Sequence, residues 1–258
     1  MDINLLETYL VTQLFAILLV FARIGSALMA MPGFAEPYIS IRARLLMAIA
    51  FSFALAPFLE QFLPAVPNNP FHLAVMLLGE IIVGLLMGTV ARFLISAMHV
   101  AGMVISFQSS LALATQFDTT QASQGSIFGN FLSLSAVLYI FALDLHHMLL
   151  RGVADSYTLM TPGNMPPLGD ISEYLSMLVQ EIFEIGVLLA APSIVIGLLL
   201  YLAAGVLARL MPNMQVFFVI MPLQLMLSFF VMMAVFTTIM TKFIMSFTTI
   251  YSDFLQGL

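Results

Sequence analysis

Charged side chains inside long apolar segments are the residues of this chain best placed to carry chemistry. Arg23, Glu80, Arg92, Asp144 and Arg209 each interrupt or closely border a segment that otherwise has the composition of a membrane-spanning helix. A charge at the centre of a lipid-exposed helix costs about 2.5–3.5 kcal/mol on insertion scales, whereas each Leu, Ile, Phe or Val contributes only about 0.3–0.6 kcal/mol. Because such charges recur across most segments, the sequence predicts helices that face protein or a water-filled path.

A stripe of charged and small residues marks the third apolar segment. Glu80, Gly84, Gly88 and Arg92 recur every four residues, so they share one slowly rotating face of a helix. Glycines on that face let another backbone approach closely. Glu80 and Arg92 would lie about 18 Å apart along the axis, so each needs its own partner. The stripe predicts close helix packing, either within the chain or at a seam between subunits, and the pattern leaves both open.

Asp144, His147 and Arg151 follow one another at helical spacing, at i, i+3 and i+7. A proton relay can have this composition, because His titrates near neutral pH and carboxylates shuttle protons. A hydrogen-bonded cluster at the membrane edge is the alternative. His146 and His147 lack the i, i+4 spacing of a zinc-binding helix and have no evident third ligand, so we expect no metal site.

The remaining reactive residues do not predict an enzyme. Ser126 lies outside any nucleophile-elbow pattern, and Glu181 and Glu184 suit a helix that enters from water. The chain has no cysteine, which excludes thiol chemistry and disulfides. Its net charge is −6 without a basic block, which gives no basis for nucleic-acid binding. We expect no catalytic residues and no cofactor.

The composition predicts an all-α, polytopic membrane protein. Hydrophobic residues make up 62% of the 258 residues and charged residues 8%, against about 25% charged in soluble domains. Pro57, Pro192 and Pro222 predict kinks or breaks, and 171–179 predicts a short interfacial helix capped by Asp170 or Ser172. Six apolar segments are long enough to span a bilayer, at 9–31, 43–63, 72–98, 127–150, 180–208 and 214–250.

A polar but nearly uncharged stretch, 103–125, separates the third and fourth segments. Its only ionisable group is Asp118, and aromatic and aliphatic residues are scattered among Ser, Thr and Gln. Non-helical backbone at membrane depth is tolerated only inside protein or along a wet cavity. The stretch therefore predicts a pore-lining or pore-plugging loop, with a plain interfacial loop as the alternative.

The chain resembles a known family on residues that run nearly from end to end. The matching residues are Arg23-Ile-Gly25, Pro32-Gly-Phe34, Arg42, Arg44, Gly79-Glu-Ile, Val83-Gly84, Gly88, Ala101-Gly102, Phe107-Gln108, His146-His147, Asp155-Ser-Tyr157, Pro162, Ala191-Pro192, Arg209, Pro212, Met214, Val216-Phe217 and Pro222-Leu223. In this order and spacing they are similar to the FliR family, the R component of the flagellar and virulence type III export gate.

The resemblance implies a channel-forming subunit of the gate that passes unfolded flagellar proteins across the bacterial inner membrane. One R chain would join several P-type and Q-type subunits, and a B-type switch component would be a further partner. The gate would lie at the centre of the flagellar basal body, raised toward the periplasmic side. Residues 1–150 would pack like a P subunit and residues 151–258 like a Q-type helical hairpin, in a single export-gate domain.

The resemblance also implies a pore plug at about 106–121, with the embedded charges as intersubunit or helix-packing contacts. The apolar plug side chains would seal the closed pore by dry contact, as hydrophobic gates do. The residues expected at the plug are Met103, Phe107, Gln108, Leu111, Leu113 and Phe117, and those expected at the packing contacts are Arg23, Glu80, Gly84, Gly88, Arg92 and Arg209.

Two functions of other classes are alternatives. A small proton-coupled secondary transporter could act through Glu80 and Asp144, although no visible internal repeat supports it. A pure scaffold, in which the polar stretch is only an interfacial turn, would assemble with partners without forming a channel.

Overall fold

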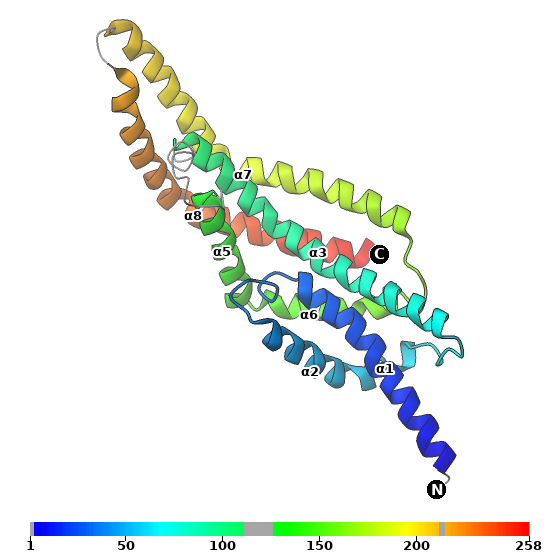
Figure 1. The fold of residues 1–258 in the computed structure, drawn as a ribbon. Coiled ribbons are helices and arrows are strands. Elements are labelled where there is room, and N and C mark those ends of the chain that lie inside the picture. Colours follow the sequence, from blue (N-terminus) through cyan, green and yellow to red (C-terminus); the bar gives the residue numbers. More distant parts are fainter. Residues whose placement is uncertain (1–2, 111–125, 212–214, 258) are drawn as a thin grey trace. The chain divides into compact units, whose positions relative to one another are not determined.

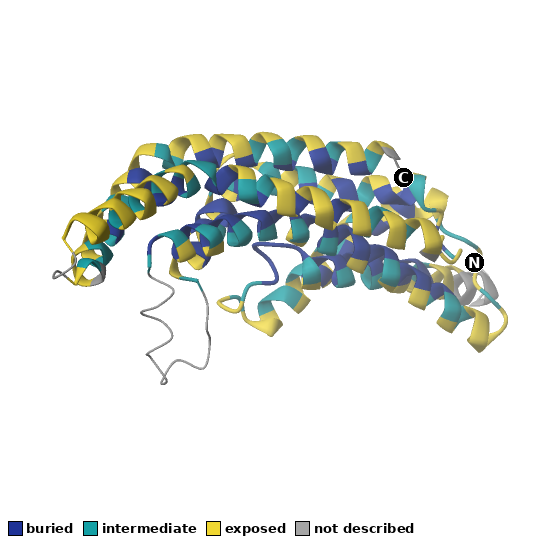
Figure 2. Ribbon diagram, turned by 90° about the horizontal axis from the view of Figure 1, so that it is seen from above, coloured by how far each residue is buried: buried dark blue, intermediate teal, exposed yellow. Residues whose placement is uncertain are grey.

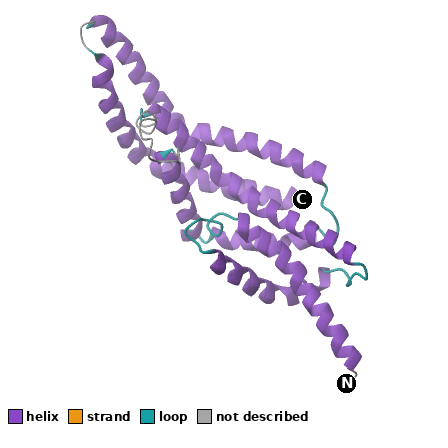
Figure 3. Ribbon diagram, viewed as in Figure 1, coloured by secondary structure: helices purple, strands orange, loops and turns teal. Residues whose placement is uncertain are grey.

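The structure is a computed structural model that describes residues 3–110, 126–211 and 215–257 (Figures 1 and 3). Within these ranges the chain is helical and contains no strand, which confirms the predicted all-α class. The elements are α1 (Ile3–Ala30), α2 (Ile41–Leu59), a short 3-10 helix (Glu60–Phe62), α3 (Pro70–Gln108), α5 (Ile127–Ala142), α6 (Leu145–Leu159), α7 (Leu168–Leu210) and α8 (Val216–Gly257).

Five of the described helices are long and apolar enough to cross a membrane. They lie within α1, α2 with the 3-10 turn that follows it, α3, α7 and α8. The pair α5 and α6 adds a sixth span if its two bent helices are counted together. The prediction of about six hydrophobic helices, some of them broken, is therefore confirmed.

The fourth predicted segment, 127–150, is not one helix. α5 ends at Ala142, α6 begins at Leu145, and the two axes differ by 78°. Asp144 between them has a left-handed backbone, with φ of 56°. Asp is among the few residues other than glycine that tolerate this conformation. The prediction of one continuous segment rested on hydropathy. Because the residues on both sides of the break are apolar, hydropathy gave no sign of it.

The separate interfacial helix predicted at 171–179 is also wrong, because α7 runs without interruption from Leu168 to Leu210. Ser172 lies inside this helix, where its Oγ donates to the carbonyl of Gly169 at 2.7 Å, so it does not cap the helix. α2, α7 and α8 also continue through their prolines. One missing N–H is tolerated in a long apolar helix whose neighbouring hydrogen bonds remain.

The described helices divide into two compact units, of which the first contains Met1–Phe93, Phe141–Ser176 and Ile250–Leu258. Its core includes Leu19 and Val20 of α1, Met87 of α3 and Tyr251 of α8, all fully buried. Figure 2 shows such buried stretches alternating with exposed ones along the helices. The division of the sequence into P-like and Q-like parts at residue 150 concerns likeness to other subunits and stays a prediction.

Close packing of α3 on α1 builds this first unit. A Cβ added at Gly84 would collide with the carbonyl oxygen of Arg23 and the hydroxyl of Ser26. One turn further along, a Cβ at Gly88 would come within 2.5 Å of the Ala27 carbonyl oxygen. The two glycines of the stripe thus allow the α1 backbone to lie directly on α3.

The second unit contains Leu94–Ile140 and Met177–Thr249. α3 and α5 cross here at two glycines, because a Cβ on Gly102 would collide with the backbone of Gly129. Aromatic side chains join α5 to α8, with the rings of Phe128 and Phe229 centred 5.3 Å apart. Small residues at one contact and large rings at the other set how closely each helix pair approaches.

We expect Gly84→Ala to lower the thermal stability of the purified chain in detergent, with an overpacking cost of about 1–3 kcal/mol. The matched control is Gly205→Ala on α7, where an added Cβ would meet no atom within 4 Å. That substitution should be neutral or stabilising, because Ala favours a helix interior over Gly by about 1 kcal/mol. Equal unfolding midpoints for both variants would contradict the packing described here.

Candidate functional site: a buried ion pair and the polar end of α3

Arg23 of α1 and Glu80 of α3 form a two-pronged ion pair inside the first unit. Arg23 Nε donates to Glu80 Oε2 at 2.7 Å, and Arg23 Nη2 donates to Glu80 Oε1 at 3.1 Å. Both side chains are 1% exposed. This parallel arrangement is the strongest geometry available to a guanidinium and a carboxylate. It neutralises two charges that would otherwise be expensive to bury.

The rest of the guanidinium is held by α6 and the residue that follows it. Arg23 Nη1 donates to Ser156 Oγ at 3.0 Å, and Nη2 donates to the carbonyl of Met160 at 3.1 Å. The Tyr157 ring lies under the guanidinium, with Cζ 4.0 Å from the ring centroid. Cation–π contact of this kind strengthens when the cation is shielded from water. Arg23 therefore joins α1, α3 and α6 at one point.

The carboxylate of Glu80 reaches the connection between α6 and α7. Gly163 N–H donates to Glu80 Oε1 at 3.2 Å. Gly163 has φ of 87°, a backbone conformation that glycine adopts without strain. The ion pair therefore also fixes the turn through which the chain leaves α6.

The other predicted packing charges lie apart from this cluster. Arg92 of α3 and Arg209 of α7 are exposed, and neither has an ion pair within the described ranges. Sequence reasoning paired none of the embedded charges, and it gave no role to Ser156, Tyr157 or Gly163. The Asp155-Ser-Tyr157 motif was a signal of their importance, but it did not indicate Arg23 as the partner.

A second cluster, in the second unit, surrounds the end of α3. Gln224 of α8 is 2% exposed. Its Nε2 donates to the backbone carbonyl of Gln108 and, at 3.2 Å, to the Tyr201 hydroxyl. Its Oε1 accepts from Ser110 Oγ at 2.8 Å. One buried amide therefore bonds both the last residue of α3 and Ser110, which follows it. Sequence reasoning missed Gln224 because a lone Gln in an apolar helix forms no spacing pattern.

Ser126 makes the corresponding contacts where the chain enters α5. Its Oγ accepts from the backbone N–H of Gly129 at 2.9 Å and donates to the carbonyl of Gly102 at 3.0 Å. The Ser106 hydroxyl lies 2.7 Å from it. The residues that precede and follow 111–125 are thus both held to α3 and its neighbours by neutral hydrogen bonds.

The structure describes only part of the predicted plug. Met103 and Phe107 lie on the last turns of α3, and Phe107 is 65% exposed. The stretch 103–108 is helical, so the prediction of non-helical backbone from residue 103 onward is wrong for these residues. An exposed aromatic at the end of an apolar helix does not break helical periodicity. Leu111, Leu113 and Phe117 lie outside the described residues.

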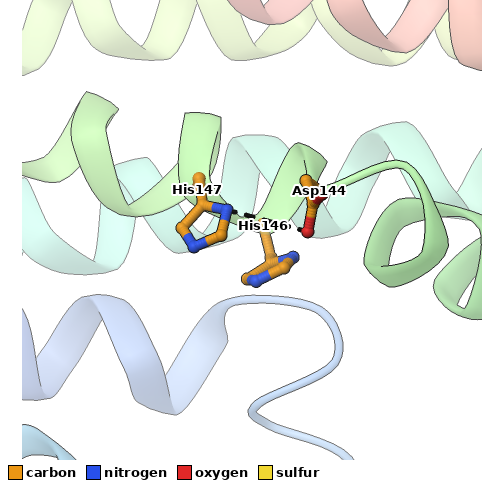
Figure 4. Close-up of side chains that lie close together, drawn as sticks. All are labelled: Asp144, His146 and His147. Atoms are coloured by element: carbon orange, nitrogen blue, oxygen red, sulfur yellow. Dashed lines mark ion pairs between the residues drawn. The ribbon is translucent and has the colours of Figure 1, made fainter.

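The acidic and basic groups of α6 separate into two exposed pairs. Asp144 Oδ1 lies 3.9 Å from His147 Nδ1 (Figure 4), and Arg151 Nε lies 3.6 Å from Asp155 Oδ2. Arg151 therefore pairs with Asp155 and not with Asp144 or His147, so the three predicted residues do not form one interacting row.

Comparison with known proteins shows that this chain is similar to bacterial export proteins. A family model described as bacterial export proteins, family 1, matches residues 14–250. The flagellar biosynthetic protein FliR of Caulobacter vibrioides is 33% identical over 215 residues, which cover 83% of this chain and 86% of that protein. The protein of the same name from Bacillus subtilis is 30% identical over 219 residues, 83% of each chain. The one from Aquifex aeolicus is 28% identical over 254 residues, covering 97% of this chain and 96% of its own.

We expect Arg23→Met to destabilise the purified chain by about 3–5 kcal/mol, because it leaves the Glu80 carboxylate buried without its partner. The double variant Arg23→Met/Glu80→Gln should recover part of that loss, since no unpaired charge remains. Thermal unfolding in detergent and the amount of chain in the membrane would measure both effects. Arg92→Met is the matched control at an exposed arginine and should leave the unfolding midpoint of the purified chain unchanged. A double variant as unstable as Arg23→Met alone would contradict the ion-pair account.

Proposed function

Because the chain belongs to the bacterial export proteins, family 1, we propose that it is a channel-forming subunit of a flagellar type III export gate. The observation that carries the proposal is the family match along almost the whole chain, together with relatives named flagellar biosynthetic protein FliR. Unfolded flagellar subunits are the proposed cargo, and the bacterial inner membrane at the centre of the basal body is the proposed location. The proposal includes no catalytic activity.

The surface of α7 and α8 supports a role inside a larger assembly. Large apolar side chains are exposed along both helices, among them Leu198 and Leu202 of α7 and Phe230 and Met233 of α8. Exposed apolar surface of this extent requires lipid or protein as its neighbour. Arg92 is exposed in the interior of the apolar helix α3, and a lone arginine there is costly in lipid, which favours protein at that position. Arg209 lies in the last turn of α7, and its proposed role as a packing contact rests on the family resemblance. P-type and Q-type gate subunits, with one copy of this chain, and a B-type switch component are the proposed partners.

The end of α3 supports a plug in the channel. The stretch for which a plug role is proposed is about 106–121, with Phe107, Gln108, Leu111, Leu113 and Phe117. Met103 supplies an exposed apolar side chain just before this stretch, and Phe107 supplies one at its start. Gln224 and Ser126 hold the chain on either side of 111–125 through neutral hydrogen bonds. Such bonds can break and reform without exposing a buried charge. This composition suits a segment that has to move when cargo passes.

The geometry gives the proton-coupled transporter no support. Glu80 is buried and bound through both carboxylate oxygens by Arg23, with a further bond from Gly163. Releasing a proton-binding carboxylate from this site would leave Arg23 buried and unpaired. Asp144, the other acid proposed for that function, is an exposed group at a helix break.

We expect native mass spectrometry of the tagged chain, purified from its own membrane in mild detergent, to detect one copy in a stable complex with several smaller membrane proteins of different kinds. The Arg92→Met and Arg209→Met variants should retain less of those partners, since both arginines are exposed on apolar helices. A monomer or homo-oligomer without such companions would contradict the gate-subunit proposal.

For the plug, we expect deletion of residues 111–121 to leave the complex assembled and to make the membrane permeable to ions. Gln224→Leu should cause a smaller leak, because it removes bonds to Gln108, Ser110 and Tyr201 at a cost of about 1–3 kcal/mol. Gln180→Leu, at an exposed glutamine of α7, is the matched control and should stay ion-tight. A potential-sensitive dye in cells that contain the whole gate would report the leak. An assembled but ion-tight deletion variant would favour a pure scaffold.

A further inference from the structure

Three potential metal ligands gather at the break between α5 and α6. Asp144 occupies the left-handed position just before α6, and His146 and His147 lie in the first turn of that helix. Figure 4 shows the three side chains drawn together at this point. One ligand atom from each residue lies within 4.8 Å of the other two.

The environment of His146 is unusual for an ordinary surface histidine. Its Nδ1 is buried and has no hydrogen-bond partner among the described residues. Its ring stacks on Phe141, with centroids 4.9 Å apart and 22° between the planes, and lies 4.1 Å from the His147 ring. A buried nitrogen without a partner is costly, and a bound ligand would satisfy it.

We propose that Asp144, His146 and His147 bind a divalent transition-metal ion of the zinc type. Two imidazoles and one carboxylate are the donor set that Zn²⁺ and its neighbours prefer, whereas Mg²⁺ and Ca²⁺ require oxygen ligands. Metal–ligand bonds of about 2.0–2.2 Å place neighbouring ligand atoms roughly 3–3.5 Å apart. The three ligand atoms lie within 4.8 Å of one another here, so binding requires side chains to move inward. The side chains of Asp144 and His147 are 77% and 71% exposed, which leaves room for that movement.

The positive end of the α6 dipole acts on both the Asp144 carboxylate and a bound cation. The N-terminus of α6 favours the ionised form of the Asp144 carboxylate, and this negative charge offsets the unfavourable effect of the helix dipole on a bound cation. Three protein ligands leave at least one coordination position of a tetrahedral ion for water or for a group from another protein. A bound ion would fix Asp144, the residue just before α6, to the first turn of that helix.

The test uses the full-length chain purified in detergent without a polyhistidine tag. After treatment with a chelator, the chain is dialysed to equilibrium against a series of Zn²⁺ concentrations in excess Mg²⁺, and the zinc bound per chain is measured by mass spectrometry at each concentration. We expect close to one zinc per chain. Asp144→Asn, His146→Gln and His147→Gln should each weaken binding at least about tenfold, since even outer-shell partners of metal ligands contribute about 10–100-fold.

Two histidines outside the cluster provide the matched controls. His72→Gln and His99→Gln should bind zinc as the unmodified chain does, because neither residue belongs to the cluster. Equal loss of zinc in these controls and in the cluster variants would overturn the proposal, because binding would then be non-specific. Absence of zinc from the unmodified chain would overturn it as well, and that result does not depend on how any variant folds.

Discussion

The first unit depends on the burial of one guanidinium and one carboxylate. Arg23 and Glu80 are both almost completely removed from water, so their mutual contact has to replace two hydration shells. That requirement accounts for much of what surrounds them. Gly84 lets the α1 backbone approach α3, Ser156 takes up the remaining side of the guanidinium, and Gly163 bonds the carboxylate. An arginine at this depth therefore dictates the positions of three helices and one turn.

The polar cluster around Gln224 follows a different principle from the ion pair. A buried charge that loses its partner costs about 3–5 kcal/mol, whereas an unsatisfied neutral group costs about 1–3 kcal/mol. Arg23 and Glu80 therefore suit a permanent joint. The amide of Gln224 and the hydroxyls of Ser110 and Ser126 suit contacts that break during a working cycle. In the proposed channel, this difference in cost separates the frame of the subunit from the part next to the plug.

Sequence alone was sufficient for the fold class, the approximate number of spans and the glycine stripe, because these depend on hydropathy and on spacing within one helix. It did not pair Arg23 with Glu80, since the two residues are 57 positions apart and lie on different helices. It also missed the break at Asp144, where apolar residues continue on both sides of one left-handed residue. The third segment was predicted to end at residue 98 because polar residues follow. α3 instead continues to Gln108, since Ser and Gln are compatible with a helix that is packed against protein.

The break at Asp144 illustrates where a helical membrane protein can place polar groups that sequence patterns do not indicate. Helix interiors satisfy their own backbone groups, so free N–H and C=O groups occur where helices end. The four described residues with positive φ are Gly33, Ser110, Asp144 and Gly163. Ser110 bonds Gln224, Gly163 bonds Glu80, and Asp144 belongs to the proposed metal site. Only Gly33, which packs under the Phe141 ring, has a purely apolar contact. Arg23, Glu80 and Gln224 lie inside helices, but each site also uses a residue at a helix end or turn, which helical periodicity does not indicate.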